Sequence, residues 1–399
     1  MVNINPATNN TMDKPNCHQG TVLGTPKGIR AIITIGELKG MILAHTATEL
    51  LGLDIAGVIN AIEKIMSIVI GKLNDWASLI SSLIALYIAA DAMAWGEPVL
   101  ESAITLVHDG HLYYRGRNAV DLAQTETLEA VARLLRGGDG YASLSLNRPL
   151  PPTDGTMRAR IFAALAQRCA VGEPQDAPGE AATLLDILTD AVTADRHGGV
   201  IHERLGWAWK CGPRGSDLIR RTLVLMADHE LNASTFAARV AASTGASLAA
   251  CALAGLTTLS GPLHGGAPAQ VLWLAAHAQQ LGDSEAMSAR LIHWPGGPGF
   301  GHPLYPRGDP RARALLQQFT ASAPMESLEA ARHAATGEPA NVDFALAALS
   351  EALDLPDDAP FAMFAIARCA GWMAHALEQR QTGALIRPRA RYTGVVPKI

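Results

Sequence analysis

Apolar positions along most of the chain recur with the spacing of an amphipathic α-helix. The clearest stretches are rich in alanine and leucine and fill most of the second half of the chain. No regular strand–helix alternation and no GxGxxG motif occurs, which argues against a dinucleotide-binding sheet. The pattern therefore predicts an all-α fold. We expect helices at 157–170, 180–195, 198–210, 214–260, 310–320, 326–336, 341–353 and 360–381.

One segment departs from this helical pattern. Residues 101–123 alternate between apolar and polar side chains around Asp109-Gly110, a dipeptide typical of tight hairpin turns. The sequence therefore predicts a short hairpin near residues 103–115. The next apolar stretch, TLEAVARLLR, predicts a helix that ends at Gly137, since glycine readily adopts the left-handed conformation of a helix C-cap.

The first part of the chain has a different texture. Residues 1–28 are polar and predict a flexible tail, whereas residues 29–94 predict an atypical apolar helical segment. The uncharged run from Trp76 to Ala90 is shorter than the roughly 20 residues that a membrane-spanning helix needs. It favours a buried or interfacial helix and no membrane partner. Residues 47–64 have the outline of a helix-turn-helix but few side chains that read DNA bases, so helical packing is favoured.

Composition and charge narrow the possible functions. The net charge of -5 gives no electrostatic footprint for nucleic acid. The 5 cysteines are scattered without a CxxC pair, which indicates a reducing cytoplasm and neither a disulfide framework nor a zinc site. The N-terminus lacks the basic start and apolar core of a secretory signal. We therefore expect a cytoplasmic protein without a metal.

Two glycine- and proline-rich clusters interrupt the helical pattern, and each contains a histidine. His264 lies in SGPLHGGA, directly before a predicted helix, where the positive helix end disfavours an imidazolium ion and leaves a neutral donor. His302 follows the loop from Pro295 to Gly301, whose backbone N–H groups suit a phosphate. Taken singly, a turn histidine at a helix end and an ordinary surface loop are the simpler interpretations.

Charged residues near these loops and on the helices are further candidates. Arg307 and Arg311 follow the second histidine, and a guanidinium pairs well with phosphate or carboxylate. Asp343 lies at a predicted helix start, where helix capping is the simpler interpretation. His229 and Arg368 lie on predicted apolar helices, where a buried polar group needs a partner.

Taken in order, several motifs resemble those of the citrate synthase family. They are DHELNAST, SGPLHGGA, GFGHPLYPRGDPRA, NVDF, RCAGWMAHALEQ and IRPRARYTG, and the resemblance extends over about residues 97–396. It implies a catalytic region at 95–396, with a large helical domain and a small mobile helical domain at approximately 265–355. It also implies a homodimer or a higher homo-oligomer.

The resemblance gives each candidate residue a role. Asp343 is the expected base for the α-proton of an acyl-CoA, His264 the stabiliser of the enolate, and His302 the polariser of the ketone. The expected ligands of the 2-oxo dicarboxylate are His229, Arg311, Arg368 and, from a neighbouring subunit, Arg387. The expected CoA-binding residues are Pro295, Gly296, Gly297, Gly299, Gly301 and Arg307. No metal or other cofactor is implied, because acyl-CoA is a substrate.

The implied reaction is the condensation of acetyl-CoA with oxaloacetate to citrate and CoA, the entry step of the tricarboxylic acid cycle. Two alternatives stay open: 2-methylcitrate synthesis from propionyl-CoA, and a non-catalytic relative that binds ligands or builds assemblies. Two departures from the family pattern lie beside His264 and His302. Pro268 stands where members commonly have asparagine, and His302 is followed by Pro-Leu-Tyr. Neither departure removes a residue of the expected site.

Overall fold

The computed structural model describes residues 100–138, 151–172, 177–196, 198–281, 297–388, 390 and 392–395, and five isolated positions between residues 57 and 67. Contacts between Cα atoms divide the chain into two units, Met1–Val99 and Leu100–Ile399. The predicted tail at 1–28 lies outside the described residues, as does the predicted segment at 29–94 apart from the five isolated positions. All the motifs with candidate chemistry fall in the second unit.

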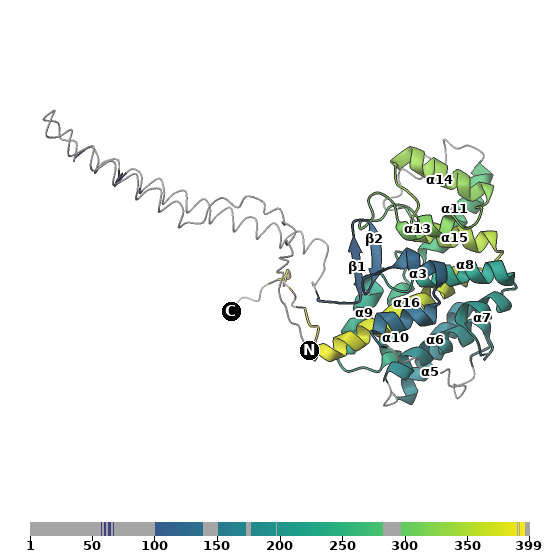
Figure 1. The fold of residues 1–399 in the computed structure, drawn as a ribbon, viewed down its shortest axis with the longest axis horizontal. Helices are drawn as coiled ribbons and strands as arrows, with labels where there is room; N and C mark the ends of the chain where they lie inside the picture. The colour runs from purple at the N-terminus through teal and green to yellow at the C-terminus, as the bar shows by residue number, and fades with distance from the viewer. Residues whose placement is uncertain are drawn as a thin grey trace, which may run out of the picture. The chain divides into compact units, whose positions relative to one another are not determined.

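The second unit is mostly helical, which confirms the predicted all-α class (Figure 1). Three short strands, β1 (Thr105–His108), β2 (His111–Tyr114) and β3 (Arg117–Asn118), precede the helices. The described helices are α3 (Ala119–Thr125), α4 (Leu128–Arg136), α5 (Met157–Val171), α6 (Ala177–Thr193), α7 (Ile201–Ala208), α8 (Gly212–Leu225), α9 (Ala233–Ser243), α10 (Leu248–Leu259), α11 (Ala267–Leu281), α13 (Pro310–Leu316), α14 (Ala323–Thr336), α15 (Val342–Ala352) and α16 (Ala359–Thr382).

Helix α16 forms the centre of the main hydrophobic core. It packs against α4, α6, α9 and α10, and every residue from Ala359 to Ala376 is buried. A helix that is apolar on all sides is stable where other elements surround it, which accounts for this central position. Pro360 fits the first turn, and Gly383 ends the helix in the left-handed conformation with a φ of 62°.

A second cluster of buried side chains lies apart from this core. Figure 1 shows three of its helices, α11, α14 and α15, together at one end of the unit. Its members are Val271, Ala275, Phe300, Met325, Leu328, Ala331, Ala340, Phe344, Ala347 and Ala348. All of them fall within the predicted small domain at 265–355, whose boundaries and mobility stay predictions.

The predicted hairpin near residues 103–115 is confirmed. β1 and β2 pair antiparallel, with Thr105 directly opposite Tyr114. Asp109 and Gly110 form the turn with φ of 47° and 74°, left-handed values that suit a two-residue hairpin turn. Residues directly opposite each other project from the same face of a sheet, so the hairpin presents Thr105 and Tyr114 together.

The helical stretch predicted at 214–260 is divided into α8, α9 and α10. Asn232 caps α9, and its Oδ1 accepts hydrogen bonds from the backbone N–H groups of Ser234 and Thr235, both at 3.1 Å. His229 therefore lies in the turn between α8 and α9, and its predicted position on a helix is wrong. The local signal for the turn is the capping asparagine, which the surrounding apolar periodicity obscured.

The described ranges lack the features of two other classes of protein. No helix in them is long and apolar enough to cross a membrane. The run from Trp76 to Ala90, which the sequence identified as too short to do so, lies outside those ranges. No group of three or more His, Cys, Asp or Glu side chains in the same ranges is arranged to hold a metal ion.

Candidate active site

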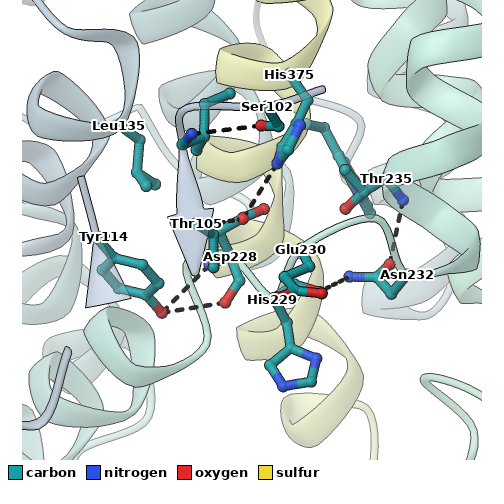
Figure 2. Close-up of polar contacts among 12 residues, drawn as sticks. Ser102, Thr105, Tyr114, Leu135, Asp228, His229, Glu230, Asn232, Thr235 and His375 are labelled. Atoms are coloured by element: carbon teal, nitrogen blue, oxygen red, sulfur yellow. Dashed lines mark hydrogen bonds and ion pairs between the residues drawn. The ribbon is translucent and has the colours of Figure 1, made fainter. Parts of the chain in front are cut away.

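His229 lies in the turn between α8 and α9, which Figure 2 shows together with its polar neighbours. Its Nε2 is 2.9 Å from the Tyr305 hydroxyl, and its ring meets that of His302 edge to face with the centroids 5.0 Å apart. The side chain is buried. Burial, and next the nearby positive charge of Arg311, hold the pKa of His229 well below its ordinary value. The ring is therefore neutral at physiological pH.

His264 lies in the turn directly before α11, where the sequence placed it. Pro268 falls in the first turn of that helix, so proline is accommodated at the departure from the family pattern. The ring packs edge to face on Phe364 with the centroids 5.4 Å apart. Burial, and next Arg368, lower the pKa of His264 to about 3. A neutral ring at this position donates or accepts one hydrogen bond without carrying charge.

Ser234 is a site residue that the sequence interpretation missed. Its hydroxyl oxygen lies 2.9 Å from His264 Nε2, 2.7 Å from Asn232 Oδ1 and 3.2 Å from Trp372 Nε1, which donates. Asn232 Oδ1 only accepts, so the hydroxyl proton is directed at Asn232 in this arrangement, and His264 Nε2 donates to the hydroxyl. The same proton can turn to His264 Nε2. If it goes to His264 Nε2, the ring carries its own proton on Nδ1 and can donate from there. The only local signal was a serine in the first turn of α9, a position that usually serves capping.

Replacing Ser234 with alanine should lower turnover by about tenfold to a hundredfold, because His264 loses the contact that orients its ring. Ser243→Ala is the matched control, since that hydroxyl donates to Val240 O of its own helix at 2.7 Å. Steady-state kinetics of both variants, alongside their thermal unfolding, make the comparison. Equal turnover in the two variants would show that Ser234 does not orient the histidine.

His302 lies in the loop before α13, and a backbone contact fixes its tautomer. Its Nδ1 accepts a hydrogen bond from the N–H of Leu304 at 3.1 Å. The proton of the neutral ring is therefore on Nε2, which is left as a donor. Burial, and next the positive charge of Arg311, lower the pKa of His302 to about 4. The ring is thus a neutral donor across the physiological range.

Arg311 is held at the start of α13 by a buried ion pair. Its Nε and Nη2 donate to the two oxygens of Asp309 at 3.0 and 2.7 Å. Asp309 Oδ2 also accepts from the N–H of Val342 at 3.1 Å, so the pair ties α13 to the start of α15. Burial lowers the pKa of Arg311, but the Asp309 carboxylate more than offsets this and keeps the guanidinium charged. Nη1 of Arg311 takes no part in the ion pair with Asp309.

Arg368 projects from α16 and is fully buried. Its Nε donates to Met226 O at 3.1 Å, and its guanidinium carbon lies 5.0 Å from the centre of the Phe364 ring. Neither Nη group donates to any other residue in the described part of the chain. Burial lowers the pKa of Arg368 to about 10, which leaves it charged at neutral pH. A buried cation with two unused donor groups suits a carboxylate ligand.

Asp343 lies in the first turn of α15, but it does not cap the helix. Asn341 takes that position, with its Oδ1 accepting from the N–H of Asp343 at 2.9 Å. The capping role considered for Asp343 is therefore wrong. Asp343 Oδ1 is buried without a hydrogen-bond partner among the described residues. Burial raises the pKa of Asp343 to about 6, although the positive charge of Arg311 opposes the shift.

The glycine-rich loop lies against the start of α15. Gly301 N donates to Pro339 O at 2.9 Å, and Asn341 N donates to Gly299 O at 2.9 Å, so the two segments pair through their backbones. Gly299 has a φ of 85°, and a Cβ there would come within 2.6 Å of Val271, so only glycine fits. Loop and helix start line a pocket of about 560 Å³. Its lining includes Gly297, Gly299, Gly301, His302, Tyr305 and Asn341.

Four of the expected site residues do not lie with the residues described above. Pro295 and Gly296 lie outside the described residues. Arg307 is exposed and pairs with Asp109 of the hairpin turn, with Nη2 3.1 Å from Oδ1. Arg387 is exposed beyond the end of α16, and its expected role in a neighbouring subunit stays a prediction.

The arrangement combines binding and proton-transfer groups in one site. Neutral His229 and His302 touch each other, and charges on Arg311 and Arg368 act on both His229 and Asp343. Two buried guanidinium groups suit a dicarboxylate. The Asp343 carboxylate, whose pKa is raised and whose Oδ1 has no hydrogen-bond partner in the described part of the chain, suits proton abstraction beside neutral imidazole donors.

Comparisons with known proteins place the chain in a family. The family model described as "Citrate synthase, C-terminal domain" matches residues 156–389. Citrate synthase 2 of Bacillus subtilis is 38% identical over 189 residues, which cover 45% of this chain and 51% of that protein. The 2-methylcitrate synthase 2 of Corynebacterium glutamicum is 32% identical over 223 residues, covering 51% of this chain and 58% of that protein. The chain thus spans about half the length of the curated relatives it matches.

Solved structures extend the similarity in space. The citrate synthase of Thermotoga maritima matches with a TM-score of 0.63 and 26% identity, covering 76% of this chain and 96% of that chain. The shared fold is the helical one described above, and the family model covers more than half of the 399 residues. The chain belongs to the citrate synthase family.

Proposed function

We propose that the chain condenses acetyl-CoA with oxaloacetate to give citrate and CoA. The observation that carries the proposal is Asp343, whose buried Oδ1 has no partner among the described residues and whose pKa is raised to about 6. Such a carboxylate is ionised at neutral pH yet basic enough to remove a weakly acidic proton. Family membership supports the same reaction class.

In the proposed first step, Asp343 takes a proton from the acetyl methyl group. The negative charge that develops on the thioester oxygen needs a donor, and His264 supplies one if Ser234 donates to its Nε2. A neutral imidazole suits this role, because its N–H donates without holding the oxygen in a permanent ion pair. The low pKa of His264 keeps it neutral throughout.

In the second step, the enolate carbon attacks the ketone of oxaloacetate. His302 Nε2–H donates to that ketone oxygen and stabilises the alkoxide that forms, since Leu304 already occupies Nδ1. Arg368 offers its two Nη groups, and Arg311 its Nη1 edge, to the two carboxylates. His229 completes this end of the site. A proton transferred to the alkoxide gives citryl-CoA, and a water molecule then hydrolyses its thioester to citrate and CoA.

The pocket of about 560 Å³ beside the glycine-rich loop is the proposed place of the acyl-CoA. Its backbone N–H groups and glycine surfaces allow a ligand to approach closely. A homodimer in which Arg387 reaches the partner's site, and a cytoplasmic location, belong to the same proposal.

The proposal is tested by following thiol release with a panel of acyl-CoA donors and 2-oxo acids. We expect acetyl-CoA with oxaloacetate to give the highest kcat/KM. A higher value for propionyl-CoA would favour 2-methylcitrate synthesis. This alternative is specific because the similar protein of Corynebacterium glutamicum is a 2-methylcitrate synthase. One methylene is worth only about 1–3 kcal/mol in an apolar pocket, so the ratio must be measured. No release with any pair would indicate a non-catalytic relative.

A further inference from the structure

The turn that carries His229 is held from outside by one cross-strand pair of the hairpin. Thr105 on β1 and Tyr114 on β2 are directly opposite each other, and Figure 2 shows both directed at Asp228. Thr105 Oγ1 donates to Asp228 Oδ2 at 2.5 Å. The Tyr114 hydroxyl lies 3.2 Å from Asp228 O and 3.1 Å from Leu225 O at the end of α8. The pair therefore holds both the side chain and the peptide that precede His229.

A third contact comes from α16. His375 Nε2 lies 3.2 Å from Asp228 Oδ2, and its Nδ1 lies 3.3 Å from Arg239 Nη1. A guanidinium only donates, so Nδ1 is the acceptor and the ring proton is on Nε2, directed at Asp228. Arg239 in turn donates to Glu378 Oε2 at 2.7 Å. His375 thus joins Asp228 to a second, separate ion pair.

Asp228 is fully buried and lies close to the backbone of α16. A Cβ at Gly371 would come within 2.1 Å of Asp228 Oδ1, so glycine is needed for this approach. Oδ1 itself has no hydrogen-bond partner among the described residues. Arg368 lies one helical turn before Gly371 and forms no ion pair within the described ranges. The Asp228 carboxylate is the charge that most favours the protonated form of Arg368.

We infer that Asp228, fixed by Thr105 and His375, is a positioning residue for the dicarboxylate end of the site. It supplies the buried counter-charge of Arg368 and fixes the peptide from which His229 projects. This inference rests on the proposed function, since it assigns Arg368 and His229 to the 2-oxo dicarboxylate. Among the described residues, the polar contacts of the Asp228 carboxylate are with Thr105 and His375 and not with His264 or Asp343, so the effect falls on binding of the dicarboxylate rather than on the chemical step.

The test removes one hydrogen bond to Asp228 without changing the volume of the side chain. Thr105→Val deletes the hydroxyl, and Thr105→Ser restores it. Thr189→Val is the matched control, because that buried hydroxyl donates only to Leu185 O of its own helix at 2.8 Å. Oxaloacetate binding by titration calorimetry and steady-state kinetics are measured on all four proteins.

We expect Thr105→Val to weaken oxaloacetate binding and raise its KM by about tenfold, because a hydrogen bond to a buried charge is lost. The kcat and the KM for acetyl-CoA should stay within about twofold, and Thr105→Ser should restore most of the affinity. Thr189→Val, which also loses a hydroxyl that donates one hydrogen bond, should bind oxaloacetate normally. A purely structural defect would instead lower the thermal stability and the kcat of both valine variants and raise their KM for both substrates.

The outcomes separate this inference from the proposed function. Unchanged oxaloacetate binding in Thr105→Val, with an active wild-type enzyme, overturns the positioning role alone. Wild-type protein that binds oxaloacetate but releases no CoA, with weaker binding in Thr105→Val, supports the positioning role and overturns the condensation. Wild-type protein that binds neither oxaloacetate nor a related dicarboxylate overturns both.

Discussion

Asp343→Asn should lower turnover by about 10²–10⁴-fold while leaving oxaloacetate affinity nearly unchanged, because it removes the proposed base and retains the shape of the side chain. In the wild-type enzyme, protonation of the same carboxylate should limit turnover at low pH. The pKa of Asp343 is raised to about 6, so its protonated fraction grows and turnover falls as pH drops through that value. A pH–rate profile of the wild type and single-pH kinetics of the variant measure both effects.

The same substitution should stabilise the protein at neutral and alkaline pH. The folded pKa of about 6 lies above the ordinary value of 3.8, so the folded state favours the neutral carboxyl. That contribution is complete at low pH and is lost as pH rises through 6. Asparagine is neutral at every pH. We therefore expect Asp343→Asn to raise the free energy of unfolding by about 1–3 kcal/mol near pH 8 and to have no such effect near pH 4.

Denaturant unfolding at the two pH values checks this expectation. Asp357→Asn is the control, since that exposed carboxylate should change neither turnover nor stability. A variant that is less stable than the wild type near pH 8 would show that Asp343 is favourably paired in the folded state. Turnover equal to that of the wild type would remove Asp343 from the mechanism.

Arg368→Lys should raise the KM for oxaloacetate by about a hundredfold. Lysine keeps the charge but loses the planar pair of donor groups that matches a carboxylate, and it cannot reproduce the contacts of Arg368 with Met226 O and the Phe364 ring. The KM for acetyl-CoA should change by less than about threefold, because the proposed acyl-CoA site is at the glycine-rich loop.

Arg380→Lys is the matched control on the same helix. Its Nη2 donates to Ala246 O at 2.7 Å, a contact that joins α16 to the turn before α10. We expect that variant to lose some stability and to keep its KM for oxaloacetate. An equal rise in KM in both variants would indicate that α16 is displaced as a whole and that Arg368 has no special role in the dicarboxylate site.

The sequence predicted the parts of the fold that depend on local pattern. The hairpin turn at Asp109-Gly110, the C-cap at Gly137 and the central apolar helix α16 follow from the conformations and burial that these residues favour. The division of 214–260 was missed because helical periodicity continues through the turn, and only Asn232 and Ser247 signal the new helix starts.

The site was predicted less completely, because its geometry depends on contacts between distant segments. The position of Asp343 at a helix start favours a cap, and only the structure shows that Asn341 takes that position and that Asp343 Oδ1 has no hydrogen-bond partner among the described residues. Ser234 and Asp228 carry no signal of their own, since their roles arise from His264 and from His375, which lie far along the chain. Long-range hydrogen bonds of this kind have no periodicity in the sequence.

In the proposed reaction this site joins the two substrates through a new carbon–carbon bond. Its most direct test incubates the full chain with oxaloacetate and acetyl-CoA labelled with ¹³C at both acetyl carbons, and identifies the organic acid by mass spectrometry. We expect citrate that carries both labels, formed in equal amount to the CoA released. Labelled acetate with free CoA, and no labelled tricarboxylate, would show that the chain hydrolyses the thioester without condensation and would overturn the proposed reaction.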